Sequence, residues 1–82
     1  MDNENTSLFD ITDIKSADIA QTLKEVIDAL EASGYQPINQ LVGYLISGDP
    51  GYVTSRMDAR SKITRHDRAE IIQELLRIYI KH

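Results

Sequence analysis

The sequence predicts an all-α fold, a compact bundle of about four short helices that follows a flexible amino-terminal tail. The length of 82 residues suits a single domain. Apolar residues recur with helical spacing in three stretches, and all glycines and prolines fall within residues 34–51, where helices are expected to end and to begin. We therefore expect a tail over 1–15 and one helical domain over 16–82, with helices near 16–33, 37–47, 56–63 and 65–80.

The first fifteen residues show no sustained helical period, because polar and acidic side chains surround isolated apolar ones. A chain end without a packed apolar face stays loose, so we expect a mobile tail here. The alternative is that Phe9 and Ile11 fold onto the core.

The first strong helix is expected to begin at Ser16 and to bury one face. At about 100° per residue, its apolar residues fall on a stripe roughly 100° wide. These residues are Ile19, Leu23, Val26, Ile27 and Leu30. Gly34 is suited to the left-handed conformation that closes such a helix.

The central stretch from Gly34 to Tyr52 predicts a short helix followed by a tight turn. Pro37 lacks an N–H and fits the first turn of a helix, where that donor is unpaired in any case. Gly48 lies where this helix should end, and Asp49-Pro50-Gly51 is a turn signal. The apolar residues between follow helical spacing: Ile38, Leu41, Val42, Leu45 and Ile46.

Residues 52–63 have weak periodicity and predict a loop with a short helix. A basic run overlaps it, and four of its arginines are candidates for contact with a phosphate or a partner protein: Arg56, Arg60, Arg65 and Arg68. A solvated basic face is the commoner explanation of such a run, since no aromatic residue is interleaved with it and the whole chain is acidic.

The last helix is expected to be capped by Thr64, with Asp67 three residues later completing the pair. Its seven apolar residues, from Ile71 to Ile80, spread over about 200° of the helical wheel. One core contact needs less than this, so the second face is expected to meet another copy of the chain. We predict an intertwined homodimer, with an interface that includes Leu75, Ile78, Tyr79 and Tyr44.

Composition limits the chemistry that the chain can perform. Without cysteine and with two histidines, the chain has no disulfide and no zinc site to stabilise a small core. Adjacent His66 and Asp67 would point about 100° apart on a helix, and the glycines do not form a phosphate-binding loop. We predict no enzyme activity, no metal and no cofactor.

Charge and hydropathy point to the cytoplasm. Residues 1–50 hold nine Asp and Glu against two Lys, whereas residues 51–82 hold seven Lys and Arg against four Asp and Glu. No run approaches the roughly 18 apolar residues of a membrane span, and the first ten residues are acidic and polar, unlike a signal peptide. We expect a cytoplasmic protein that does not insert into a membrane.

The segment GYQPINQLVGYLISGDPGYV resembles the IreB family of small regulatory phosphoproteins. The likeness continues through Asp58-Ala59-Arg60 and through DRAEIIQEL from Asp67 on, and it extends from about Thr6 to Lys81. It implies a substrate of a transmembrane Ser/Thr kinase with extracellular cell-wall-binding repeats, and of the cognate phosphatase. It also implies a negative regulator of the cell-envelope stress response and of cephalosporin resistance in Gram-positive bacteria, which acts on a downstream protein.

The same resemblance implies that threonines in the tail are the phosphoacceptors. Counted back without gaps from GYQPINQ, Thr6 falls on one of these positions, and Asn3, which cannot be phosphorylated, falls on the other. A mobile tail offers the accessible hydroxyl that a kinase needs. Thr12 and Ser7 are the reserve candidates.

Two uses of the basic segment 56–68 remain open. Phosphorylation could dock the tail on it, because the new dianion is repelled by the acidic tail and attracted by these arginines. Alternatively, the two short helices around Gly48 could form a helix-turn-helix-like unit. The chain would then be a small nucleic-acid-binding protein that uses the same basic segment 56–68. The acidic first half of the chain argues against nucleic acid as a partner.

Overall fold

A computed structural model gives the structure of the chain and describes residues 11–81. Every regular element in this range is helical, with no strand, which confirms the all-α prediction with four α-helices. The helices are α1 (Ile11–Ala32), α2 (Pro37–Ser47), α3 (Ala59–Thr64) and α4 (Arg68–Lys81), and two short 3₁₀ turns, η2 (Pro50–Tyr52) and η3 (Arg56–Asp58), join α2 to α3.

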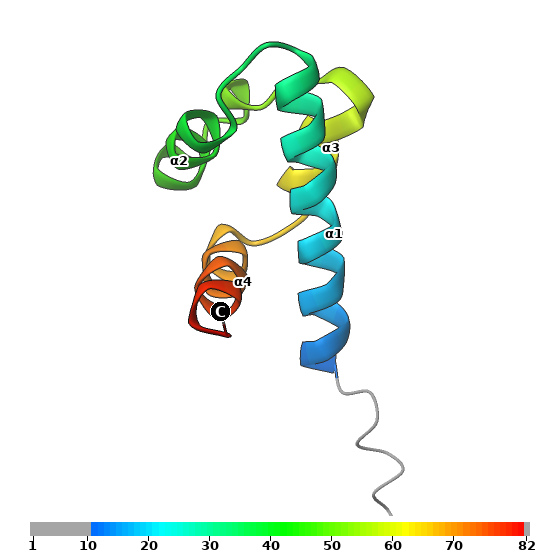
Figure 1. The fold of residues 1–82 in the computed structure, drawn as a ribbon, viewed down its shortest axis with the longest axis vertical. Coiled ribbons are helices and arrows are strands. Elements are labelled where there is room, and N and C mark those ends of the chain that lie inside the picture. The colour runs from blue at the N-terminus through cyan, green and yellow to red at the C-terminus, as the bar shows by residue number, and fades with distance from the viewer. Residues whose placement is uncertain (1–10, 82) are drawn as a thin grey trace, which may run out of the picture.

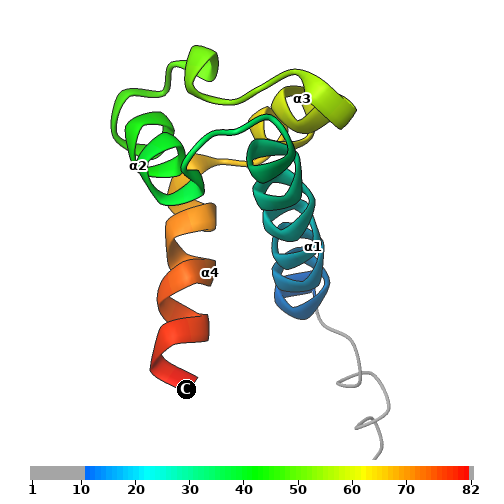
Figure 2. The ribbon, with the colours of Figure 1, turned by 45° about the horizontal axis from the view of Figure 1, so that its top comes forward.

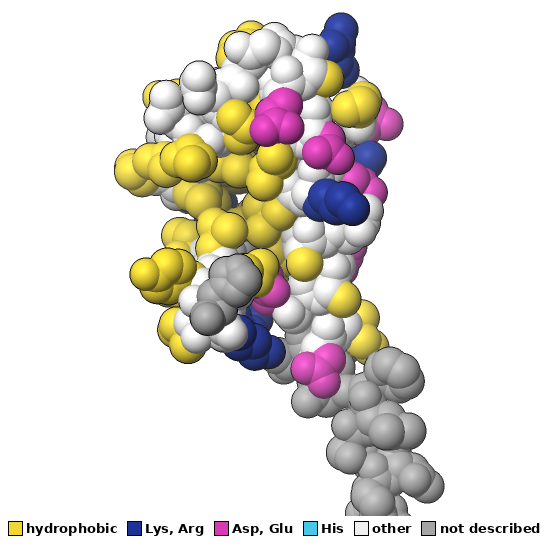
Figure 3. Space-filling model, viewed as in Figure 1, with side chains coloured by type: hydrophobic (Ala, Val, Ile, Leu, Met, Phe, Trp, Pro, Cys, Tyr) yellow, Lys and Arg dark blue, Asp and Glu magenta, His cyan; other side chains and the backbone are white. Residues whose placement is uncertain are grey.

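The long helix α1 is the spine of the described structure (Figure 1). The short α3 packs against α1, and α2 and α4 lie together on another side of it (Figure 2). The space-filling view shows apolar side chains gathered over the side formed by α2 and α4 (Figure 3).

Helix α1 starts earlier than the sequence analysis expected. It begins at Ile11, five residues before the predicted start at Ser16. The additional turn has no apolar stripe to reveal it, since Ile14 within it is half exposed. Its stabilising tertiary contacts are polar instead: Lys15 pairs with Glu70 at 3.3 Å, and Ser16 donates to the Glu74 carboxylate. A helix already nucleated extends readily through such residues.

The predicted ends of the first two helices are confirmed. Gly34 has φ +85°, its N–H bonds to the Glu31 carbonyl and the next N–H bonds to the Leu30 carbonyl, which is the paired arrangement that closes helices. Pro37 opens α2 as predicted. Gly48, with φ +75°, closes α2 through an N–H that donates to the Tyr44 carbonyl.

The predicted start of α4 is wrong by three residues. Thr64 is the last residue of α3, and its hydroxyl donates to the Arg60 carbonyl. Asp67 takes the capping role because its carboxylate accepts from the Ala69 N–H at 2.8 Å, and α4 then begins at Arg68. The sequence analysis expected Thr64 to be the cap and Asp67 to be its partner, and the structure gives the capping role to Asp67.

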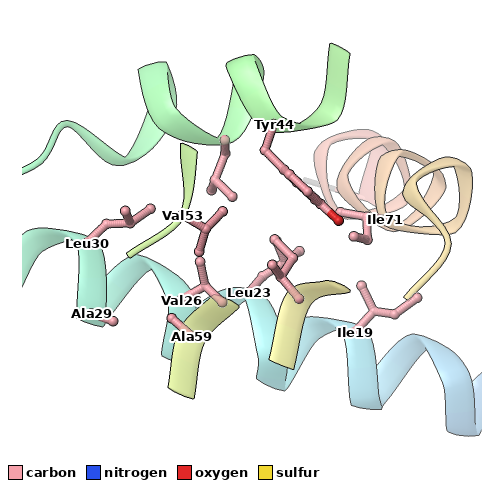
Figure 4. Packing of buried hydrophobic residues seen from close by; sticks show 11 residues of the cluster. Ile19, Leu23, Val26, Ala29, Leu30, Tyr44, Val53, Ala59 and Ile71 are labelled. Atoms are coloured by element: carbon pink, nitrogen blue, oxygen red, sulfur yellow. The ribbon is translucent and has the colours of Figure 1, made fainter. Parts of the chain in front are cut away.

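The core lies between α1, α3 and the loop that carries Val53 (Figure 4). Four of the five residues in the predicted α1 stripe are buried, and Ile27 packs partly against them. Tyr44 from α2 and Ile71 from α4 complete the core. The buried apolar residues are Ile19, Leu23, Val26, Ala29, Leu30, Leu41, Tyr44, Val53, Ala59, Ile63 and Ile71.

Helices α2 and α4 leave most of their apolar residues uncovered. Of the five apolar positions predicted on α2, only Leu41 is buried, while Ile38 and Ile46 are about three-quarters exposed. On α4 the core takes Ile71 alone among the apolar residues. Helix α2 is therefore anchored in the core by Leu41 and Tyr44, and α4 by Ile71 together with the buried Glu74, while most of their other apolar side chains are exposed.

Candidate functional site

The predicted phosphoacceptors lie at the amino-terminal end of the chain. Thr6 and Ser7 are outside the residues that the structure describes, so their assignment remains a prediction. Thr12 lies in the first turn of α1. Phosphate near a helix amino terminus is electrostatically favourable.

Three of the four candidate arginines donate to backbone carbonyls in other parts of the chain, whereas Arg65 donates to the carbonyl of the nearby Lys62. Arg56 donates to the Ala32 carbonyl at 2.8 Å and so caps the end of α1. Arg60 donates through Nε to the carbonyls of Pro50 and Val53. These contacts fasten the loop between α2 and α3 and satisfy carbonyls that lack helical partners.

Arg68 has a similar role, because it donates to the Leu45 carbonyl at 3.1 Å near the end of α2. Arg65 reaches toward Asp18, whereas Arg56 reaches Ala32, fourteen residues further along α1. At 1.5 Å per residue these two points are about 21 Å apart. The arginines of segment 56–68 therefore do not form one continuous phosphate-binding patch.

A polar pocket of about 300 Å³ lies where α1, the turn between α3 and α4, and the first turn of α4 meet. We call it the α1–α4 pocket, and it is lined by Lys15, Asp18, Ile19, Arg65, His66 and Glu70. Its volume reaches the lower end of the range typical of ligand sites. Among its residues the sequence analysis had proposed a phosphate contact for Arg65 alone.

Loose ion pairs and hydrogen bonds organise the α1–α4 pocket. Arg65 Nη2 lies 3.8 Å from Asp18 and 3.5 Å from the Thr22 hydroxyl. His66 Nε2 lies 3.1 Å from the same hydroxyl, and the ring is mostly buried. Lys15 is 3.3 Å from Glu70. The pocket thus brings together Lys15, Arg65 and the His66 ring, and each lies near a carboxylate: Lys15 at 3.3 Å from Glu70, and Arg65 and His66 at 3.8 and 3.9 Å from Asp18.

Glu74 is a buried acid that the sequence analysis did not single out. It is 5% exposed and lies on the side of α4 that contacts α1. Ser16 donates to its Oε1 at 2.5 Å, and Arg77 donates to the same atom at 2.6 Å. A buried carboxylate is tolerated where it is paired and hydrogen-bonded in this way. Glu74 therefore ties α4 to α1 by polar contacts.

The largest unexplained feature of the described residues is the apolar surface of α2 and α4 (Figure 3). On α2, the exposed Ile38, Val42 and Ile46 repeat every four residues and so form one stripe. Leu75 and Tyr79 on α4 are also spaced by four. We define the α2–α4 apolar surface as Ile38, Val42, Ile46, Ile72, Leu75, Leu76, Ile78 and Tyr79, all exposed. Contiguous apolar surface on a protein marks an interaction site.

One predicted interface residue does not belong to this surface. Tyr44 is 4% exposed and packs into the core of its own chain, with its ring toward Ile71 (Figure 4). It lies on the opposite side of α2 from the Ile38 stripe, because positions two apart on a helix, such as Tyr44 and Val42 or Ile46, point about 200° apart. Leu75, Ile78 and Tyr79 are exposed, as an interface requires.

The fold and its surfaces define a class: a small all-helical protein with a polar pocket and an unpartnered apolar surface. In residues 11–81 no group of three or more His, Cys, Asp or Glu could hold a metal ion. No helix in the same range is long and apolar enough to cross a membrane.

Comparison with protein families narrows this class. The family model described as IreB regulatory phosphoprotein matches residues 4–81. The chain therefore belongs to the IreB family of regulatory phosphoproteins, which are not enzymes. This match confirms the resemblance carried by GYQPINQLVGYLISGDPGYV.

Proposed function

We propose that this chain is phosphorylated on Thr6 by a transmembrane Ser/Thr kinase and dephosphorylated by the cognate phosphatase. In this proposal it acts in the cytoplasm as a negative regulator of the cell-envelope stress response and of cephalosporin resistance. Family membership is the observation that carries the proposal.

The mechanism that we propose is protein–protein interaction, with the chain as a homodimer. The α2–α4 apolar surface supports this proposal, since an exposed surface of this kind is costly in water unless a partner covers it. A second copy is the partner that suits an 82-residue chain without disulfides, whose own core is small. The downstream protein would then bind a dimer.

The nucleic-acid alternative has no comparable support. Arg56, Arg60 and Arg68 donate to backbone carbonyls, and a nucleic-acid site needs its arginines free to reach phosphates. Addition of duplex DNA at moderate salt is expected to leave the NMR resonances of residues 56–68 unmoved.

A test of the phosphoacceptor uses cells that lack the native protein and carry the wild type or one variant. Mass spectrometry after cephalosporin exposure is expected to find phosphate on wild type, on Thr12→Ala and on Ser7→Ala, and to lose it in Thr6→Ala. Deletion of the kinase is expected to remove it from all of them. Phosphate that persists on Thr6→Ala at the level of the wild type would overturn the assignment.

The regulatory role is tested in the same strains by their cephalosporin susceptibility. The strain without the protein is expected to be more resistant than the wild type. Thr6→Ala is expected to differ in resistance from Thr12→Ala, which keeps the acceptor. Equal resistance in the deletion strain and the wild type would contradict a negative regulator.

A further inference from the structure

We propose that the α1–α4 pocket receives the phosphate of phosphorylated Thr6 from the same chain. This inference rests on the proposed function, because it requires phosphate on Thr6. It differs from docking along the whole basic segment 56–68, since it uses only Arg65 and His66 from that segment and adds Lys15 from α1.

The pocket lies within reach of Thr6. The chain enters α1 at Ile11, and Lys15 is four residues further on, or about 6 Å along the helix axis. Thr6 precedes Ile11 by five residues, which span up to about 17 Å when extended. This length is sufficient for the segment to turn back along α1 and bring a phosphate to Lys15.

Arg65 is the arginine best able to take a new partner. Its contacts are long: 3.8 Å to Asp18, 3.5 Å to Thr22 and 3.3 Å from Nε to the Lys62 carbonyl. Its side chain is 56% exposed. In contrast, Arg56 donates to the end of α1 at 2.8 Å, and loss of that bond would leave a carbonyl unpaired. Arg65 can reorient toward a phosphate at little cost.

Lys15 and His66 line the pocket together with Arg65. The Lys15 side chain is 58% exposed, and the Glu70 carboxylate with which it pairs is also accessible to water. His66 lines the same pocket and holds its ring against Thr22. A phosphate oxygen between Arg65 and Lys15 would accept charge-assisted hydrogen bonds from both, which are the stronger class of hydrogen bond.

Asp18 and Glu70 make the pocket selective for a doubly charged group. They carry one negative charge each and hold Arg65 and Lys15 in the absence of phosphate. A phosphothreonine carries about −1.5 to −2 charges at neutral pH and offers three acceptor oxygens, so it competes for these cations where an acidic side chain does not. The carboxylates therefore keep docking weak and reversible, and their removal should strengthen it.

Docking would link phosphorylation to the α2–α4 apolar surface. Glu70 lies in the first turn of α4, and the same helix carries Ile72, Leu75 and the rest of the α4 stripe. A segment held at the start of α4 would therefore contact the helix that carries part of the surface that we propose for partners.

The test uses the full-length protein with phosphothreonine installed at position 6 during synthesis, so that no kinase is needed. The probe is the ³¹P NMR signal of the phosphate followed against pH, compared with a free phosphopeptide of residues 1–10. Docking is expected to lower the titration midpoint in the protein, because nearby cations favour the dianion. The backbone resonances of Lys15, Arg65 and His66 are expected to shift as well.

Four variants identify the site. Arg65→Gln and, independently, the surface change Lys15→Gln are expected to move the midpoint back toward the value for the free peptide. Asp18→Asn is expected to lower it further. Arg56→Gln is the matched control with an arginine outside the pocket, and it should leave the midpoint unchanged.

Three results would overturn the inference. One is a midpoint in the protein equal to that of the free peptide. Another is an equal effect of Arg56→Gln and Arg65→Gln. The third is a midpoint that returns to the peptide value on dilution, which would assign the phosphate to a second chain. Because the phosphate is placed chemically, none of these results bears on whether a kinase phosphorylates Thr6 in cells.

Discussion

The described chain has two regions with similar apolar patterning and opposite outcomes. In the region of α1 and α3, most apolar residues are covered, with Val26, Leu30 and Ile63 fully buried. In the region of α2 and α4, residues of the same type and spacing stay exposed, among them Ile46 and Tyr79 at 78% each. Helical periodicity thus predicts that a face is apolar, but it does not predict what covers that face.

The largest expected difference between the two regions is in the response to side-chain truncation. Ile63→Ala removes a fully buried side chain and is expected to lower the free energy of unfolding by about 2–5 kcal/mol. Ile80→Ala, at a position 77% exposed, is the matched control and should cost less than about 0.5 kcal/mol. Urea denaturation measures both. Equal losses of unfolding free energy in Ile63→Ala and Ile80→Ala would contradict the distinction between the covered and the exposed region.

A smaller effect is expected where α2 is fastened to the turn that follows it. A Cβ at Gly43 would lie 2.5 Å from Cε1 of Tyr52, so Gly43→Ala is expected to cost about 1 kcal/mol net, despite the higher helix propensity of alanine. In a Tyr52→Ala background the ring is absent, and the same change should stabilise by up to about 1 kcal/mol. Thermal unfolding measures the stability of the wild type and of the substituted Tyr52 background, each with and without Gly43→Ala. The same effect of Gly43→Ala in both backgrounds would contradict the close approach.

The attachment of α4 can be tested at its cap. Asp67→Ala removes the carboxylate that accepts from Ala69 and is expected to cost about 1 kcal/mol. Thr64→Ala removes the hydroxyl of the cap that the sequence suggested, and it should cost less because that hydroxyl only donates within α3. Chemical denaturation of both variants measures the loss of unfolding free energy that each substitution causes. A greater loss of stability for Thr64→Ala than for Asp67→Ala would show that Thr64 is the cap of α4 after all.

The smallest expected effect concerns an ion pair on the surface of the covered region. The pKa of Glu25 is lowered, first by the hydrogen bond that Gln21 donates and then by Lys62, whose ammonium lies 3.1 Å away. A carboxyl whose pKa falls on folding contributes stability above its unfolded pKa, and this contribution is lost as the pH falls through its folded pKa.

Glu25→Gln should therefore be slightly less stable than the wild type at pH 7. The difference should shrink below about pH 4, near the pKa of glutamate in an unfolded chain. Unfolding curves across this range provide the measurement, with the exposed Glu31→Gln on the same helix as the control. A difference that stays constant down to low pH would show that the carboxylate charge has no part in it.

What the sequence could predict follows from the range of the interactions involved. The closing glycines at 34 and 48 and the opening Pro37 obey local rules, and the helix ends that they predict agree with the structure. The core stripe of α1 was also predictable, because its period is read from neighbouring residues.

Features that depend on contacts between distant elements were not predictable in this way. The side of α2 on which Tyr44 lies, and the burial of Glu74, follow from where α4 and α1 meet. The α1–α4 pocket joins residues about 50 positions apart. Sequence reasoning identified Arg65 as a basic residue, but it could not separate this side chain from the arginines that hold backbone carbonyls.

The measurement that tests the central claim most directly is the mass of the protein in solution. Light scattering at micromolar concentration is expected to give twice the 9.3 kDa of one chain. Leu76→Asp, at a position 55% exposed on the α2–α4 apolar surface, is expected to give the monomer mass with unchanged helical circular dichroism. Ile14→Asp, 53% exposed on α1, is the matched control and should remain a dimer. A wild-type monomer, or a Leu76→Asp dimer as stable as the wild type, would contradict the account.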